Sequence, residues 1–331
     1  GKPGNYFLKD IKNNKELQYN FGKKDFFIYR LAFYNKSNIL VVGECYEYNK
    51  AVFSRDNLVI YNIEKNKVVK EIPYFGKIHE RLIKRIAVTP DDEKIIVALE
   101  NYVIIYNAKN FNKIKEFEHG LANPFIYLTN EGNIILQEYP YYNSDVILFD
   151  IKSGSKINSL TGHRLAASCV TYNSNQYVTI NSETGLISFY DAKSLTLQKV
   201  VKTKNCEINK QITEFEFLPD NINIIASCLD KTVKIINTET GDWTAFLKNE
   251  DGSDWIVYNS DGYWDASANG GDLVAMVKGT ECWNIDQFAV KNNRPDLIYA
   301  KLPFKDDNLI DHYKNQYFKR LKKLGFVDVN G

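Results

Sequence analysis

The sequence predicts an all-β fold, a closed ring of four-stranded antiparallel sheets. Two series of hairpin signals alternate strictly along the chain, and the unit recurs at intervals of 41 to 52 residues. Such a period is typical of architectures in which one supersecondary unit stacks on the next. Aromatic residues make up 14 % of the chain, with 22 Tyr and 19 Phe, and this composition favours strands over helices.

The first series consists of a hydrophobic strand that ends in Asp or Asn, a polar turn and a second strand. The segment VILFDIKSGSKINSL, around Asp150, has this form. The six members carry their Asp or Asn at Asp10, Asn62, Asn107, Asp150, Asp191 and Asn237.

The second series is a hairpin of two apolar strands, as in IYRLAFY followed by NILVVGE. Its flanks alternate or run apolar in the manner of strands. Asn, Asp, Gly and Pro at its turns supply the backbone angles that tight turns require. The six turns lie near residues 36–37, 90–92, 130–132, 173–175, 219–221 and 260–262.

The order of the two series predicts how the ring closes. Five complete four-stranded units lie between about residues 28 and 248. This leaves one hairpin of the first series, which we call outer hairpins, at 6–21, and one hairpin of the second series, which we call inner hairpins, at 255–268. Pairing these halves in one sheet would remove open sheet edges. The sequence therefore predicts a six-bladed β-propeller in which N- and C-terminal strands share a blade. If strands within 273–288 complete the last blade instead, the N-terminal hairpin begins a seventh.

One unit carries a family resemblance. The segment SCLDKTVKIINTETGDW (227–243) resembles a repeat of the WD-repeat family. Asp230 and Thr232 match the turn and the start of the third strand, and Thr240-Gly241 matches the following turn. Ile236-Asn237 stands where that family has Trp-Asp.

The resemblance also implies a structural blade motif. In the WD-repeat family a turn Asp, a His, a Ser or Thr and the Trp form a buried hydrogen-bonded set. Here only one unit has the preceding Gly-His step, and aromatic-Asp or aromatic-Asn pairs replace most Trp-Asp pairs, as expected for a divergent bacterial propeller. The implied motif residues are Asp230, Thr232, His163, Asp191 and Asp150.

A second resemblance covers residues 254–272 and 292–302. Both segments are similar to the closing segment of certain bacterial WD-repeat proteins, some of which also carry a caspase-like peptidase domain. No such peptidase domain is predicted here. The likeness implies a regulatory or scaffold setting in a bacterium.

We expect two parts, a propeller over 1–290 and a C-terminal extension over 291–331. The spacing of Leu309, Tyr313 and Tyr317 predicts an amphipathic helix over about 307–324. We expect Asp306 or Asp307 to be the N-cap of this helix and Gly325 to end it. We expect the helix to pack on the propeller of a monomeric protein; docking to a partner is the alternative.

Bulk properties exclude several function classes. The formal net charge is +1, unlike that of a basic nucleic-acid-binding domain. The chain contains no run of about 18 apolar residues, so no membrane span is predicted. The five cysteines have no Cys-x-x-Cys spacing, so a zinc module is not expected. A start methionine is absent. Two locations therefore stay open: the protein is cytoplasmic, or it is exported after removal of an N-terminal leader.

The chain shows no local signature of catalysis, such as a nucleophile elbow or a phosphate-binding Gly-rich loop. We therefore predict no catalytic, cofactor-binding or metal-binding residues. The preferred function is a non-catalytic protein–protein interaction scaffold. The alternative is a propeller hydrolase or lyase with a metal or glycan site in a central channel. That alternative requires convergent carboxylates, for which the candidates are Glu44, Glu100, Glu138 and Glu183.

Two long loops give the prediction of a partner-binding surface. Residues 44–57 and 137–145 occupy equivalent places between second and third strands, so they should project from the same rim. Tyrosine is common in binding hot spots. The alternative is that these aromatic rings tuck against the rim. The predicted partner-binding residues are Tyr46, Tyr48, Phe53, Tyr139, Tyr141 and Tyr142.

Overall fold

The computed structural model consists mainly of antiparallel strands, which confirms the all-β prediction. It divides into two compact units: unit 1 contains Gly1–His163 and Ala192–Leu195, and unit 2 contains Arg164–Asp191 and Thr196–Gly331. The structure describes residues 5–10, 15–20, 26–37, 39–46, 57–65, 67–73, 83–138, 144–163, 165–171, 173, 175–181, 184–204 and 212–326.

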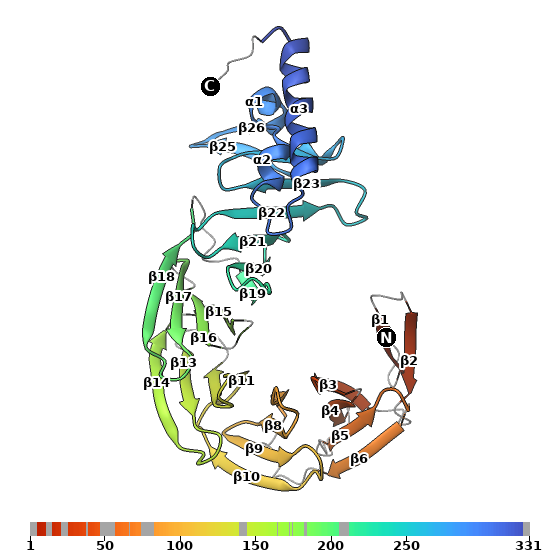
Figure 1. The fold of residues 1–331 in the computed structure, drawn as a ribbon, viewed down its shortest axis with the longest axis vertical. Coiled ribbons are helices and arrows are strands. Elements are labelled where there is room, and N and C mark those ends of the chain that lie inside the picture. Colours follow the sequence, from red (N-terminus) through yellow and green to blue (C-terminus); the bar gives the residue numbers. More distant parts are fainter. Residues whose placement is uncertain are drawn as a thin grey trace. The chain divides into compact units, whose positions relative to one another are not determined.

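Unit 1 contains one two-stranded and three four-stranded sheets among its described residues (Figure 1). In every sheet, strands that follow one another in the sequence are neighbours. The two-stranded sheet pairs β1 (Asn5–Asp10) with β2 (Lys15–Asn20). The others are β3 (Phe26–Phe33), β4 (Ile39–Tyr46), β5 (Asn57–Asn62) and β6 (Lys67–Pro73); β7 (Arg85–Val88), β8 (Lys94–Ala98), β9 (Tyr102–Asn107) and β10 (Lys113–Glu118); and β11 (Pro124–Leu128), β12 (Ile134–Glu138), β13 (Ser144–Phe149) and β14 (Lys156–His163).

Unit 2 contains a four-stranded, a six-stranded and a two-stranded sheet in its described part. The first comprises β15 (Leu165–Val170), β16 (Gln176–Asn181), β17 (Leu186–Asp191) and β18 (Leu197–Lys202). The second comprises β19 (Ile212–Phe217), β20 (Asn223–Cys228), β21 (Val233–Asn237), β22 (Trp243–Lys248), β23 (Trp255–Asn259) and β24 (Trp264–Ala266). The third pairs β25 (Ala275–Lys278) with β26 (Glu281–Asn284), and α1 (Ala289–Asn292), α2 (Pro295–Tyr299) and α3 (Asp307–Lys323) follow.

All twelve predicted hairpins form. Each first-series Asp or Asn ends a strand or directly follows one, as Asn62 does in the β5–β6 hairpin and Asp150 in the β13–β14 hairpin. Five of the second-series turns join the first two strands of a sheet, from β3–β4 to β19–β20, and the sixth joins β23 to β24, the last two strands of the six-stranded sheet. Turn chemistry and strand composition are local properties, so the sequence predicts these elements well.

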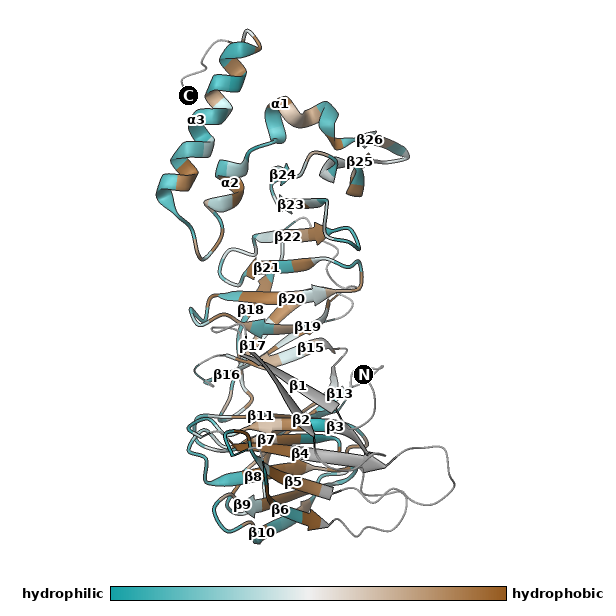
Figure 2. Cartoon of the chain, turned by 90° about the vertical axis from the view of Figure 1, so that its right-hand side faces the viewer, coloured by the Kyte–Doolittle hydropathy of each residue, from teal (hydrophilic) through white to brown (hydrophobic). Residues whose placement is uncertain are grey.

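The core lies between neighbouring sheets. On β8, Ile95 and Val97 pack in one cluster with β4 and β5, whereas Ile96 packs in another cluster with β12. A strand buried on both faces is apolar throughout rather than alternating, which explains the run IIVA. Hydrophobic residues accordingly colour much of strands such as β5 and β21 brown in Figure 2. First strands of neighbouring sheets also lie close together, β3 by β7 and β7 by β11 in unit 1, and β15 by β19 in unit 2.

The structure differs from the predicted closure. The hairpin at 255–268 was expected to share a sheet with the N-terminal hairpin, but β23 pairs with β22, and β1–β2 forms a sheet of its own. The physical reason is the short connection after β22: the Asn249 amide donates to the Asp254 carbonyl at 3.0 Å, which returns the chain along the edge of β22. No sheet in the described part of the chain is closed, and β25–β26 completes none of the others.

The C-terminal helix α3 is present and begins and ends where the sequence predicts. The Asp306 carboxylate accepts hydrogen bonds from the amides of Asn308 (2.9 Å) and Leu309 (3.4 Å) and so caps the helix. Gly325 follows it with a φ of +80°, the left-handed conformation that commonly ends helices. None of the described helices is long and apolar enough to cross a bilayer.

Candidate functional site

The predicted aromatic surface falls largely on residues that the structure leaves undescribed, 47–56 and 139–143. Tyr46 ends β4, where its backbone is paired with Phe26. The side chains of all six proposed partner-binding residues lie outside the described residues. Partner binding through these loops therefore stays a prediction.

The described polar residues instead explain how the repeated turns are held. In the outer hairpins, the Asp150 carboxylate accepts hydrogen bonds from the amide (2.6 Å) and the hydroxyl (2.7 Å) of Ser153. These bonds lower the pKa of Asp150. The Asn237 side chain likewise accepts from the amides of Glu239 and Thr240, both at 2.9 Å. Asp and Asn recur here because a short side chain with a carbonyl oxygen reaches the amides two and three residues later.

This role gives a first prediction. Replacing Asp150 by Ala leaves turn amides without their acceptor, so the free energy of unfolding should fall by about 1 to 2 kcal/mol. Asp150→Asn keeps the acceptor oxygen and should cost less than half as much. Urea unfolding followed by circular dichroism measures both values. Equal losses for the two variants would show that the carboxylate charge, not the turn geometry, matters.

The other blade-motif residues behave in different ways. Asp191 ends β17, and its carboxylate accepts from Gln198 Nε2 at 3.5 Å. His163 ends β14, where its backbone pairs with Ser144, but its side chain lies outside the described residues. The structure thus assigns distinct partners to residues that the resemblance grouped together.

Three threonines that the sequence analysis missed hold the inner hairpins. Thr89, Thr129 and Thr171 each directly follow the first strand of a second-series hairpin and are buried. Each hydroxyl accepts a hydrogen bond from the amide that re-enters the sheet, at 3.0, 3.1 and 3.1 Å respectively. The detectable signal was a Thr one or two residues before three of the six predicted turns.

Asp230 and Thr232, both predicted motif residues, do come together. The Asp230 Oδ1 atom accepts from the amide (3.0 Å) and the hydroxyl (2.5 Å) of Thr232. Its Oδ2 atom accepts from Lys234 Nζ at 3.2 Å. The Lys234 side chain is only 3 % exposed and lies over the Trp243 ring, 6.0 Å from its centroid. Burial raises the pKa of Asp230, but the bonds from Thr232 and the charge of Lys234 outweigh this, so that the pKa is lowered overall.

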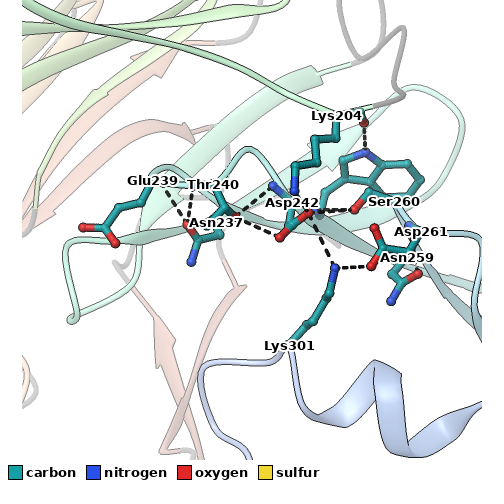
Figure 3. A network of polar contacts seen from close by, with 10 residues as sticks. Lys204, Asn237, Glu239, Thr240, Asp242, Asn259, Ser260, Asp261 and Lys301 are labelled. Carbon is teal, nitrogen blue, oxygen red and sulfur yellow. Dashed lines mark hydrogen bonds and ion pairs between the residues drawn. The ribbon is translucent and has the colours of Figure 1, made fainter. Parts of the chain in front are cut away.

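A second polar cluster joins four separate segments of unit 2 (Figure 3). We call Lys204, Asp242, Asp261 and Lys301 the clasp. The Asp242 carboxylate lies 2.9 Å from Lys204 Nζ and 3.5 Å from Lys301 Nζ, and Lys301 also pairs with Asp261. These residues follow β18, precede β22, join β23 to β24 and follow α2. The clasp therefore ties the end of one sheet to the turns of the next and to the C-terminal helices.

Hydrogen bonds to backbone carbonyl groups reinforce the clasp. Trp243 Nε1 donates to the Lys204 carbonyl at 2.6 Å, and the Lys204 amide donates to the Gly241 carbonyl at 2.9 Å. Gly241 has a φ of +74°, and a Cβ there would lie 2.3 Å from the Lys202 carbonyl oxygen. Only glycine fits this close approach, which gives a structural reason for the Thr-Gly turn.

The two C-terminal segments at 254–272 and 292–302 meet in unit 2. The Arg294 amide donates to the Trp264 carbonyl at 3.0 Å, so residues after α1 cover the free edge of β24. The Arg294 guanidinium pairs with both carboxylate oxygens of buried Asp296, at 2.9 and 2.6 Å. A Cβ at Gly270 would lie 2.0 Å from the Trp255 carbonyl oxygen, so this glycine permits close backbone packing.

No model of a known protein family and no curated protein matches this chain.

The carboxylates proposed for an enzymatic site are used elsewhere or lie outside the described residues. Glu100 pairs with Lys84 at 3.9 Å, and Glu138 accepts from the Ala122 amide at 3.4 Å. The side chains of Glu44 and Glu183 are not described. Among the described residues, no three His, Cys, Asp or Glu side chains are grouped to hold a metal ion.

Proposed function

We propose that this chain is a non-catalytic scaffold that binds other proteins, built on a divergent WD-repeat-like β-propeller of bacterial type. The observation that carries the proposal is the repetition of one antiparallel sheet with the same two kinds of capped turn. The closeness of first strands, and cores that lie between sheets, support the interpretation of these sheets as blades. Stacked repeats of this kind typically present loops on a rigid frame for binding.

The use of the charged groups supports a non-catalytic role. The clasp brings two ammonium groups to two carboxylates, which balance each other's charge. Asp230 is neutralised by buried Lys234 in the same way. An active site instead needs reactive groups directed at a substrate, with pKa values matched to proton transfer. The charged groups of the clasp and of the Asp230–Lys234 pair hold turns and connect segments.

The two aromatic loops provide the test. A tagged full-length protein should capture a defined partner from an extract of the source organism, and the Tyr141→Ser/Tyr142→Ser variant should lose it. The expected loss is at least about tenfold, because tyrosines at the centre of an interface commonly contribute a kcal/mol or more each. Quantitative mass spectrometry, followed by direct binding measurements with the recovered protein, gives the result.

A matched control uses an exposed aromatic residue outside the loops. Phe304 is 64 % exposed, so Phe304→Ser should leave folding and capture unchanged. If the Tyr141→Ser/Tyr142→Ser variant still captures the partner and Phe304→Ser does not, the binding surface lies outside the two loops. If neither variant nor the wild-type protein binds any protein above background, the scaffold proposal fails.

A further inference from the structure

The exposed side of helix α3 carries a self-complementary row of charges. Asp307, Asp311, Asn315, Lys319 and Lys323 follow one another at intervals of four residues. Residues four apart form a continuous ridge on a helix surface. All five are exposed, and the other side of α3 packs against α2, where the rings of Tyr313 and Tyr299 stack 5.4 Å apart. We call these five residues the α3 ridge.

The α3 ridge has the symmetry that contact with an identical helix requires. Asp307 and Lys323 each lie eight residues from Asn315, and Asp311 and Lys319 each lie four residues from it. An antiparallel copy centred on Asn315 therefore places each carboxylate opposite an ammonium group. Contacts related by a two-fold axis need this self-complementarity, since the same patch serves on both subunits.

Within a single helix, the same arrangement is unfavourable. Asp307 and Asp311 are like charges four residues apart, as are Lys319 and Lys323, and such pairs destabilise a helix. The helix dipole favours acidic residues in the first turn and basic residues in the last. It does not account for Asp311 and Lys319, which lie beyond those turns. No ion pair involving these four residues occurs in the described part of the chain.

Apolar side chains of α3 lie beside the α3 ridge. No residue of α3 is buried, although the helix contains Leu309, Tyr317 and Leu321. Phe318 is 37 % exposed and neighbours the ridge on the helix surface. A helix of this length depends on packing for its stability, so a second helix would cover apolar surface as well as satisfy charges.

We propose that a second copy of this chain docks antiparallel on the α3 ridge and forms a two-fold symmetric dimer. This dimer replaces the monomer expected from the sequence, and it does not depend on the proposed scaffold function. Exposed ion pairs are individually weak and are screened by salt. The association should therefore be transient and should weaken at least about fivefold when salt is raised from about 0.05 to about 0.5 M.

Charge exchange on the full-length protein provides the test. Sedimentation equilibrium should show a dimer that increases with concentration between about 10 µM and about 1 mM. Asp307→Lys/Asp311→Lys makes the ridge basic throughout, and Lys319→Glu/Lys323→Glu makes it acidic throughout. Each variant alone should associate at least about tenfold more weakly, because every pair becomes repulsive. An equimolar mixture of the two should associate again, now as a heterodimer.

The control Lys319→Arg/Lys323→Arg keeps the charge and should dimerise like the wild type. Thermal unfolding establishes that every variant is folded before its association is measured. A wild-type protein that stays monomeric overturns the proposal. So does a dimer that both charge variants retain, or a mixture of two folded variants that does not associate.

Discussion

Replacing Asp230 by Ala should lower the free energy of unfolding of unit 2 by about 2 to 3 kcal/mol. The substitution leaves the Lys234 ammonium, only 3 % exposed, without its carboxylate partner. It also removes the acceptor of the Thr232 amide and hydroxyl. A fully buried pair would cost more when broken, but the Asp230 side chain is 30 % exposed, so water screens part of the loss.

Urea unfolding followed by tryptophan fluorescence measures this effect. All four tryptophans lie in unit 2, and Trp243 lies beside Lys234. Asp230→Asn preserves an acceptor for Thr232 and should cost about half as much as alanine. Combining Asp230→Asn with Lys234→Met removes both charges and should recover most of the loss, because the destabilising group is the buried ammonium that has lost its carboxylate. Strict additivity in this double-mutant cycle would show that the two groups do not interact.

The sequence predicted the hairpins well because their causes are local. Apolar runs such as KIIVA and turn residues such as Pro90-Asp91-Asp92 act over a few positions. The closure of the ring was inferred from order alone, and the order does not determine where a hairpin docks. The direction of the chain after Lys248 depends on the short turn at Asn249, whose hydrogen bonds select the edge of β22.

The polar sites divide in the same way. Asp230 and Thr232 are two residues apart, so a motif predicts their contact. Lys234, by contrast, is of a residue type that usually lies at the surface. Only the structure shows that it is buried against Trp243. The clasp joins Lys204 to Lys301 through Asp242, and residues so far apart in the sequence give no local signal of their contact.

Acidification should destabilise the protein through His119. This side chain is buried in the connection between β10 and β11, where its Nδ1 atom accepts from the Leu121 amide at 3.0 Å. Desolvation by burial lowers the pKa of His119 from its ordinary value of 6.5 to about 4. As the pH falls below about 6.5, the unfolded chain binds this proton before the folded one does. The free energy of unfolding should therefore decrease by up to about 3 kcal/mol by pH 4 and stay constant in this term above pH 7.

His119→Asn isolates this contribution, because an asparagine oxygen can still accept from the Leu121 amide but does not titrate. Its free energy of unfolding, measured by urea denaturation from pH 7.5 to 4.5, should fall less steeply than that of the wild type. The difference between the two proteins should shrink as the pH decreases, since only the wild type loses stability through this group. Parallel profiles for the wild type and His119→Asn would mean that the buried imidazole is protonated as easily in the folded protein as in the unfolded chain.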